Sequence, residues 1–531
     1  MKQYILPSFA LALSALALTS CDDFLDTMPD NRATLDSTEK IKNILVSAYP
    51  DSDYAYLAEL SSDNMDDAGP SVSFTTYWLE DTYAWKDEIE SDNESAEHFW
   101  ETCYSGIANA NQALLAIEEA GGADASQMLS ELKGEALMCR AYNHFMLAQI
   151  FCKHWTQNAA SDLGLPYMTH AETTLKPEYT RGNLADFYAE IEADLIEGLQ
   201  RVGDSYYDVP KYHFNQRAAW AFATRYYLYT EQWQKAVDAA GKCLGAQPKS
   251  MLRDNLGISL MAQTTDAICN EYINPSSNAN LLLITAYSSL GLTFGDYKIN
   301  GRINHGKYLA QNEDMQAANI WGGPSLIYNG PRVYPGTNIM RTIFWKYPYL
   351  MEYTDIVAGI GYYRTVMPVL TTDETLLNRA EAYIMLREYD KAAADLTTWM
   401  QNFTSSTKVL TPEEITTFYK GKEYCYDDPT GMSSTIKKHL NPSFAIDGEG
   451  TTQECMLQCM LGFRRLETMH QGLRWFDIKR YGIEIPRRLL NSAGEPEKKT
   501  DFLGKDDLRR AIQIPQKVRD AGLQGNPRKE D

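Results

Sequence analysis

The 531-residue sequence predicts a mainly α-helical protein, in which tetratricopeptide-like helix pairs form a helical body that is interrupted by an irregular, loop-rich lobe, a typical place for a binding surface. Three observations support this fold class. Apolar residues recur at steps of three and four over long stretches, an aromatic-rich helix–turn–helix pattern occurs twice, and the stretch between its copies is rich in Gly, Pro, Asn and Tyr. With 44% hydrophobic and 23% charged residues, the composition is that of a globular chain.

The N-terminus has the features of a bacterial lipoprotein signal. A short basic start precedes the apolar stretch Ile5–Leu18, which is too short to span a bilayer. The stretch ends in Leu18–Thr19–Ser20–Cys21, which has the pattern of a lipobox. We therefore expect residues 1–20 to be a removable signal peptide, Cys21 to be lipidated, and residues 21–37 to form a lipid-anchored tether. An ordinary secretory signal with an incidental Cys is the alternative.

Long amphipathic helices are predicted in the first part of the helical body, residues 38–247. Ser95 is a typical N-cap for a helix running to about Ala120, and Ser126–Trp155 places its apolar residues along one face of a long helix. Asn183 is expected to cap the next helix.

One helix-pair pattern then occurs twice, in Tyr226–Ala236 and Ala382–Ala392. Each copy has an aromatic-bearing helix, a short polar turn, a second aromatic, and x-Lys-Ala opening another helix, which is the pattern of a tetratricopeptide repeat. The copies lie 156 residues apart and are not tandem. A coincidence between two amphipathic hairpins is the alternative. The second copy opens the second part of the body, residues 371–531.

Between these parts, residues 248–370 are expected to form the irregular loop-rich lobe. Leu281–Tyr287 is a β-like run, and most of the remainder has the Gly and Pro content of loops and short strands. A second irregular stretch is predicted over residues 421–450, with helix returning at Thr451.

The net charge and the absence of known catalytic motifs disfavour several classes of function. A net charge of −22 disfavours contact with phosphate backbones, so no nucleic-acid partner is expected. Zincin His pairs, nucleophile elbows, phosphate loops and dinucleotide fingerprints are absent from the sequence, so no cofactor and no metal are expected. A carboxylate pair for glycoside hydrolysis stays open, because such a pair is defined by its distance in space. The acidic cluster Asp63–Asp67 is interpreted as a solvated loop or helix cap, with calcium binding as the alternative. Cys455 and Cys459 are expected to pack in the core.

Aromatic residues offer a binding chemistry instead. They make up 11% of the chain, and rings on Gly-rich or acidic loops can stack on the apolar face of a sugar while neighbouring polar groups bind its hydroxyls. Peptides could use the same surface, and the alternative is that such rings pin long loops to the helical body. The predicted ligand-binding residues are Trp78, Tyr83, Trp85, Trp321, Tyr328 and Tyr334.

Several segments resemble the SusD/RagB family of outer-membrane lipoproteins from Bacteroidetes. The strongest is Gly472–Gly482, which is similar to the family's C-terminal Gly-x-Arg-Trp-Phe-Asp-Leu-x-Arg segment. With the lipobox, the resemblance spans nearly the whole chain. Weaker similarities lie in Trp100–Asn111, Gly134–Tyr142, Ile512–Pro515 and Asn526–Pro527.

The resemblance implies a fold with four tetratricopeptide-like helix pairs and a non-catalytic role. Family members lie on the cell surface over a SusC-like, TonB-dependent β-barrel transporter of the outer membrane, capture an oligosaccharide, or a peptide in RagB-like cases, and deliver it. Arg474 and Trp475 are expected to be salt-bridge and core residues. The family's binding residues vary, so none is carried over. A surface glycoside hydrolase and a repeat scaffold are the remaining alternatives.

Overall fold

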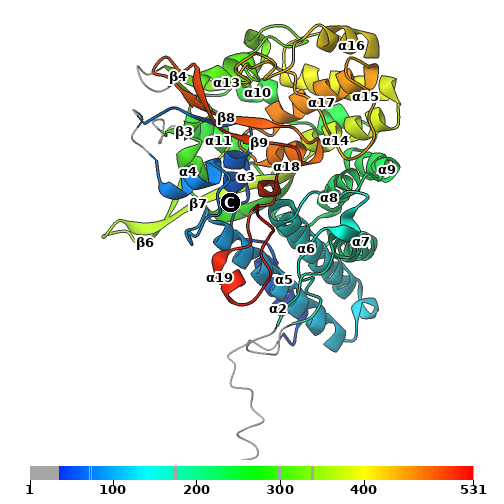
Figure 1. Cartoon of the computed structure of the whole chain (residues 1–531). Helices are drawn as coiled ribbons and strands as arrows, with labels where there is room; N and C mark the ends of the chain where they lie inside the picture. Colours follow the sequence, from blue (N-terminus) through cyan, green and yellow to red (C-terminus); the bar gives the residue numbers. More distant parts are fainter. Residues whose placement is uncertain are drawn as a thin grey trace, which may run out of the picture.

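The computed structural model describes residues 35–70, 72, 75–171, 178–295, 301–335 and 340–529; for residues 332–335 and 340 it describes the backbone alone. The predicted signal peptide, Cys21 and most of the tether lie outside these residues. Helices dominate the molecule, and most strands gather on the side opposite α7 and α9 (Figure 1). The predicted fold class, mainly helical with tetratricopeptide-like pairs, is confirmed.

The helices follow one another in the order expected from the apolar periodicity. Ser95, Ser126 and Asn183 each accept a backbone N–H at the start of a long helix, as predicted for N-caps. The helices are α2 (Thr38–Leu45), α3 (Ala55–Ser61), α4 (Tyr77–Tyr83), α5 (Ala96–Glu119), α6 (Gln127–Phe151), α7 (Leu184–Arg201), α8 (Gln216–Tyr229), α9 (Trp233–Leu244), α10 (Asn255–Leu260), α11 (Thr265–Tyr272), α12 (Leu290–Thr293), α13 (Lys307–Asn312), α14 (Thr372–Met385), α15 (Tyr389–Phe403), α16 (Pro412–Lys420), α17 (Thr452–Glu467), α18 (Leu473–Arg480) and α19 (Gln516–Asp520).

The two copies of the repeat pattern form the hairpins α8–α9 and α14–α15. Glu231 and Arg387 occupy the same place in the two turns, and both have the left-handed φ, 60° and 61°, that reverses the chain in so few residues. Helix α14 packs against both α8 and α9. The two pairs, distant in sequence, are therefore neighbours in space.

In the part of the chain that the structure describes, three small sheets accompany the helices. The first has the order β3-β1-β8-β9, the second β2-β7-β6, and the third β4-β5. Strand β2 contains the β-like run predicted from the sequence, and its partner β7 continues beyond the body as a hairpin with β6 (Figure 1). The strands are β1 (Asp66–Asp67), β2 (Asn280–Tyr287), β3 (Ile303–Asn304), β4 (Arg332–Pro335), β5 (Met340–Ile343), β6 (Leu350–Asp355), β7 (Ile360–Thr371), β8 (Ile485–Leu490) and β9 (Pro496–Leu503).

The C-terminal segment Gly472–Gly482 lies in the core. Gly472 has φ +77°, and a Cβ atom there would come within 2.8 Å of the Cα of Ala55, so only glycine allows α18 to approach α3 this closely. Trp475 is fully buried, and Arg474 forms a bidentate ion pair with Asp63, with both N–O distances 2.8 Å. The expectation of structural roles for Arg474 and Trp475 is confirmed.

The acidic cluster Asp63–Asp67 is buried, so its interpretation as a solvated loop is wrong. Basic side chains distant in sequence reach each carboxylate, which compensates for the loss of its hydration. Asp66, for example, binds Arg488 with N–O distances of 2.9 and 3.0 Å. We call the connected set the buried ion network; it consists of Asp63, Asp66, Glu313, Lys438, Arg465, Arg474 and Arg488. Lys and Arg side chains already bind the carboxylate oxygens of this network, so these oxygens no longer favour a calcium site.

Candidate ligand-binding site

The short pairing of β1 with β3 sets the position of α4. Asp67 lies opposite Ile303, and Arg302, directly before β3, binds the Asp67 carboxylate through two N–H groups at 2.7 Å each. A third N–H of the same guanidinium donates to Glu80 on α4 at 3.0 Å. A planar, five-donor guanidinium can hold two carboxylates at once, so Arg302 fixes α4 beside the sheet.

Helix α4 presents two aromatic rings at its start. Tyr77 is 86% exposed, while Trp78 is half-buried and packs on Tyr56 with ring centroids 5.0 Å apart. Tyr56 packs in turn on Phe294 at 5.6 Å, and its hydroxyl donates to Thr293 at 2.7 Å. Because each ring rests on another, Trp78 has a firm support and keeps part of its surface accessible.

A small hollow of about 20 Å³ lies beside these rings. Arg302 lines it, as does Arg341, which is buried; burial lowers the pKa of the Arg341 guanidinium to about 10. We call this surface the α4 face; it consists of Tyr77, Trp78, Leu79, Arg302 and Arg341 over the floor formed by Tyr56 and Phe294. It combines accessible rings with guanidinium groups.

Tyr83 and Trp85 lie inside the molecule. The guanidinium of Arg487 is held between the two rings, 4.0 Å from the centroid of Tyr83 and 3.8 Å from that of Trp85. The Trp85 indole N–H donates to the carbonyl of Ser61 at 2.9 Å. Neither ring offers an exposed face, and both hold loops against the body, which is the alternative that the sequence left open.

The second group of predicted residues lies elsewhere. Trp321 is only 2% exposed and packs on Phe463 at 5.4 Å. Tyr328 is half-buried, and its backbone N–H donates to the carbonyl of Phe403 at 3.2 Å. Tyr334 lies in β4, and its side chain is outside the described part of the chain. Trp78 therefore lies at an accessible surface, whereas Trp321 lies in the interior.

The expectation from sequence left out Tyr77, Arg302 and Arg341. Tyr77 adjoins Trp78 in the sequence, which is a signal that could have included it. The two arginines carry no local pattern, because strand pairing and the packing of β5 bring them to α4 from segments more than 200 residues away.

A larger groove lies beside α16, with a volume of about 520 Å³, within the range of ligand pockets. Phe418 is its single aromatic side chain, and the ammonium of Lys422 lies 4.7 Å from the centroid of that ring. Lys408, which also lines the groove, donates to the carbonyl of Ile320 at 2.7 Å. We call this the α16 groove; its lining is Ile320, Lys408, Val409, Leu410, Glu413, Glu414, Thr417 and Phe418.

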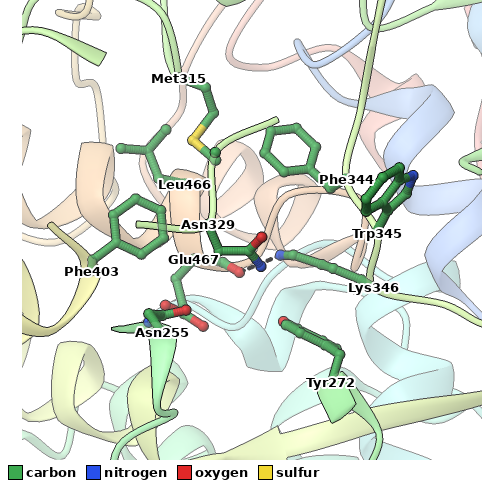
Figure 2. A pocket seen from close by; sticks show the side chains of 11 residues that line it. Asn255, Tyr272, Met315, Asn329, Phe344, Trp345, Lys346, Phe403, Leu466 and Glu467 are labelled. Atoms are coloured by element: carbon green, nitrogen blue, oxygen red, sulfur yellow. Dashed lines mark hydrogen bonds between the residues drawn. The ribbon is translucent and has the colours of Figure 1, made fainter. Parts of the chain in front are cut away.

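An inner cavity of about 20 Å³ is shown in Figure 2. Lys346 points its Nζ at the backbone carbonyl of Glu467, to which it donates at 2.6 Å, and also donates to that of Met469 at 3.0 Å. Burial lowers the pKa of Lys346 to about 8. This volume holds about one water molecule, so the cavity is too small for a sugar ring.

Among the residues that the structure describes, no three His, Cys, Asp or Glu side chains gather in a way that could hold a metal ion. In the same part of the chain, no helix combines the length and the apolar character needed to cross a bilayer.

Residues 23–228 match a SusD-like family model whose description is "Starch-binding associating with outer membrane". No curated protein sequence matches the chain.

Solved structures match over almost the whole length. A putative sugar binding protein from Bacteroides vulgatus is 18% identical, with a TM-score of 0.64, over 93% of this chain and 99% of that one. A SusD superfamily protein from Bacteroides thetaiotaomicron is 19% identical, with a TM-score of 0.60, over 93% and 100%. A SusD-like carbohydrate binding protein from Bacteroides vulgatus is 15% identical, with a TM-score of 0.58, over 91% and 96%. At these identities the likeness shows a shared fold.

Proposed function

Since residues 23–228 belong to the SusD-like family and the chain has the fold of SusD superfamily proteins, we propose that it binds an oligosaccharide at the cell surface without cleaving it. The names of its relatives, which include starch-binding, sugar-binding and carbohydrate-binding proteins, support this ligand class. The observation on the molecule itself that carries the proposal is the α4 face, where Tyr77 and Trp78 begin the helix whose Glu80 is bound by Arg302.

The chemistry of the α4 face suits a sugar. The C–H bonds on one side of a pyranose ring stack on an indole or phenol ring, and the firm support beneath Trp78 reduces the entropy lost on binding. Guanidinium N–H groups and carboxylate oxygens are donors and acceptors for hydroxyls. Arg302, Glu80 and Asp67 are already held in place by one another, so they form a prearranged polar border to the aromatic surface.

The six predicted residues take different parts in this proposal. Trp78 contacts the ligand, while Tyr83 and Trp85 support the neighbouring loop through Arg487. Trp321 supports the α16 groove from within, and Tyr328 and Tyr334 remain proposed ligand contacts of the irregular lobe. The α4 face is preferred to the larger α16 groove because that groove has a single aromatic ring, and Lys422 lies over it.

We also propose how the ligand is used. Lipidated Cys21 anchors the protein to the outer membrane with its body exposed at the cell surface, and a SusC-like, TonB-dependent β-barrel receives the oligosaccharide. A peptide ligand, as in RagB-like proteins, is the principal alternative. A glycoside hydrolase and a repeat scaffold are weaker alternatives.

The first test is a binding screen of the lipid-free chain from Asp22 onward. Affinity electrophoresis and calorimetry would cover neutral glycans, acidic glycans and peptides, with release of products measured in the same samples. Trp78→Ala is expected to weaken glycan binding by 10- to 100-fold, as the loss of one stacking ring does. Phe502→Ala removes another exposed ring, on β9, and is the matched control.

Each outcome separates the alternatives. Binding without product, lost in Trp78→Ala and kept in Phe502→Ala, supports the proposal. Product release contradicts the non-catalytic role, and binding of peptides alone replaces the ligand class. Glycan binding that survives Trp78→Ala excludes the α4 face as the site.

A further inference from the structure

The outer half of the β6–β7 hairpin is exposed on both faces. Strand β7 is buried from Thr365 onward, whereas residues 350–364, which form the end of the hairpin, are exposed or half-buried. In Figure 1 this end projects away from the body as an arm. We call residues 350–364 the arm.

The tip of the arm is apolar and ordered. Ile356 is 82% exposed and Val357 is fully exposed. The carboxylate of Asp355 accepts the backbone N–H groups of Val357 and Ala358 at 2.9 Å each, so the turn holds both β-branched side chains outward. A fixed turn that presents large apolar groups to solvent indicates a contact surface.

Aromatic residues surround the arm behind this tip. Tyr353 on β6 and Tyr362 on β7 are both more than half exposed. Tyr353 pairs with Gly361 and Tyr362 with Glu352, so the two rings belong to adjacent cross-strand pairs and lie on opposite faces of the hairpin. At about 3.3 Å per strand residue, the tip lies roughly 10 Å beyond these rings.

The arm also carries few charged side chains, in a protein whose net charge is −22. Residues 356–363 contain no charged side chain. Glu352 is paired with Arg364, and the carboxylate of Asp355 is bound by the turn. Asp355 has no cation beside it, but its two backbone hydrogen bonds lower the cost of bringing its carboxylate into the polar headgroup layer of a membrane.

From this order of side chains we infer that the arm inserts its tip into the surface of a lipid bilayer. Aliphatic groups at the end, Tyr rings about 10 Å behind them and an uncharged stretch between them on the β7 side match the layers of a membrane interface, with the hydrogen-bonded carboxylate of Asp355 in the polar headgroup layer. The unpaired backbone carbonyls of a turn limit insertion to the headgroup–acyl boundary. The proposed lipid anchor at Cys21, 14 residues before Leu35, would keep the body close enough for this second contact.

A site-specific probe tests the arm. Val357→Cys would carry an environment-sensitive fluorophore, and Leu260→Cys, at a 78% exposed residue of α10, would carry the control probe. The eight cysteines of the described residues are buried, which keeps labelling selective. The chain from Asp22, with a histidine tag, would be held on phosphatidylcholine vesicles by nickel-chelating lipids. Attachment to the vesicles then does not depend on lipidation. The experiment therefore tests insertion of the arm independently of the proposed lipid anchor.

Acyl-chain nitroxide lipids are expected to quench the probe at residue 357 at least threefold more than the probe at residue 260. Ile356→Asp, in the same labelled chain, is expected to remove that difference. Equal quenching of both probes would overturn the inference. A spectral shift of the 357 probe that grows with protein concentration without vesicles would replace the bilayer with a second copy of the chain.

Discussion

The α4 face and the α16 groove are built on different foundations. Beneath the α4 face, β1 leads into the buried ion network, in which Asp63 and Asp66 bind basic side chains from the C-terminal third of the chain. Ile320 lines the α16 groove, and the next residue, Trp321, belongs to an interior stack of rings, with Trp321 on Phe463 at 5.4 Å and Phe463 on Trp399 at 4.6 Å. One surface rests on paired charges and the other on apolar packing.

Helix α17 serves both regions. Phe463 joins the ring stack, and Arg465, two residues later, binds Glu313 of the ion network at 3.0 Å. A spacing of two places residues on different sides of a helix. The two surfaces therefore share α17 as a support, but they should respond differently to removal of a charge, to low pH and to loss of side-chain volume.

The largest expected effect comes from breaking the ion network. Asp63→Asn leaves Arg474 without its negative partner in the interior and removes one of the two network carboxylates that face Arg465 and Lys438, which should lower the free energy of unfolding by about 3–5 kcal/mol. Urea unfolding measures this change. Glu413→Gln, an exposed carboxylate at the α16 groove, is the control and should change stability by less than about 0.5 kcal/mol. Equal effects would mean that the network contributes nothing.

Removing a ring from the stack should come next. Trp321→Ala leaves a cavity against Phe463 and is expected to destabilise the fold by about 3 kcal/mol. Glycan affinity should stay within twofold of the unsubstituted protein under conditions where the variant is folded. A tenfold loss of affinity would move the binding site toward the α16 groove.

Low pH should destabilise the buried ion network more than the stack of rings. Burial raises the pKa of Glu313, but Lys438, Arg488 and Arg465 outweigh it and lower that pKa to about 2. A depressed folded-state pKa stabilises the fold above the unfolded value of about 4.5, and that contribution is lost as pH falls from there toward 2. We expect a loss of about 2 kcal/mol between pH 6 and pH 3 from this group.

Hydrogen exchange locates that loss. Amides of residues 59–67, which adjoin the ion network, should lose protection at higher pH than those around Trp399 and Phe463. Loss of protection at the same pH in both segments would show that the ion network and the ring stack unfold as one unit.

Arg302 tests the polar border of the α4 face. Arg302→Met keeps much of the side-chain length and removes the contacts with Asp67 and Glu80, so α4 loses its attachment to the sheet. Glycan affinity should fall about tenfold, measured by calorimetry, with Lys499→Met on β9 as the control. Unchanged affinity would contradict the proposed role of this guanidinium.

Much of the fold was predictable because local patterns determine it. The caps at Ser95, Ser126 and Asn183 and the two repeat hairpins follow from short-range preferences. Burial of the Asp63–Asp67 cluster was not predictable, since its compensating cations are supplied by segments hundreds of residues away. For the same reason, the sequence predicted both Trp78 and Trp85 as ligand contacts, although contacts with Ser61 and Arg487 hold the Trp85 ring in the interior.

The smallest expected effect is at Phe418. Its ring lines the α16 groove and is half-buried under Lys422, so Phe418→Ala removes apolar surface without opening the interior stack. Stability should change by about 1 kcal/mol or less, and glycan affinity by less than twofold. The double variant Trp78→Ala, Phe418→Ala should then bind no more weakly than Trp78→Ala, because independent sites do not couple. If Phe418→Ala weakens binding tenfold instead, the ligand binds in the α16 groove. The volume of a groove would then predict the binding site better than the exposure of aromatic rings does.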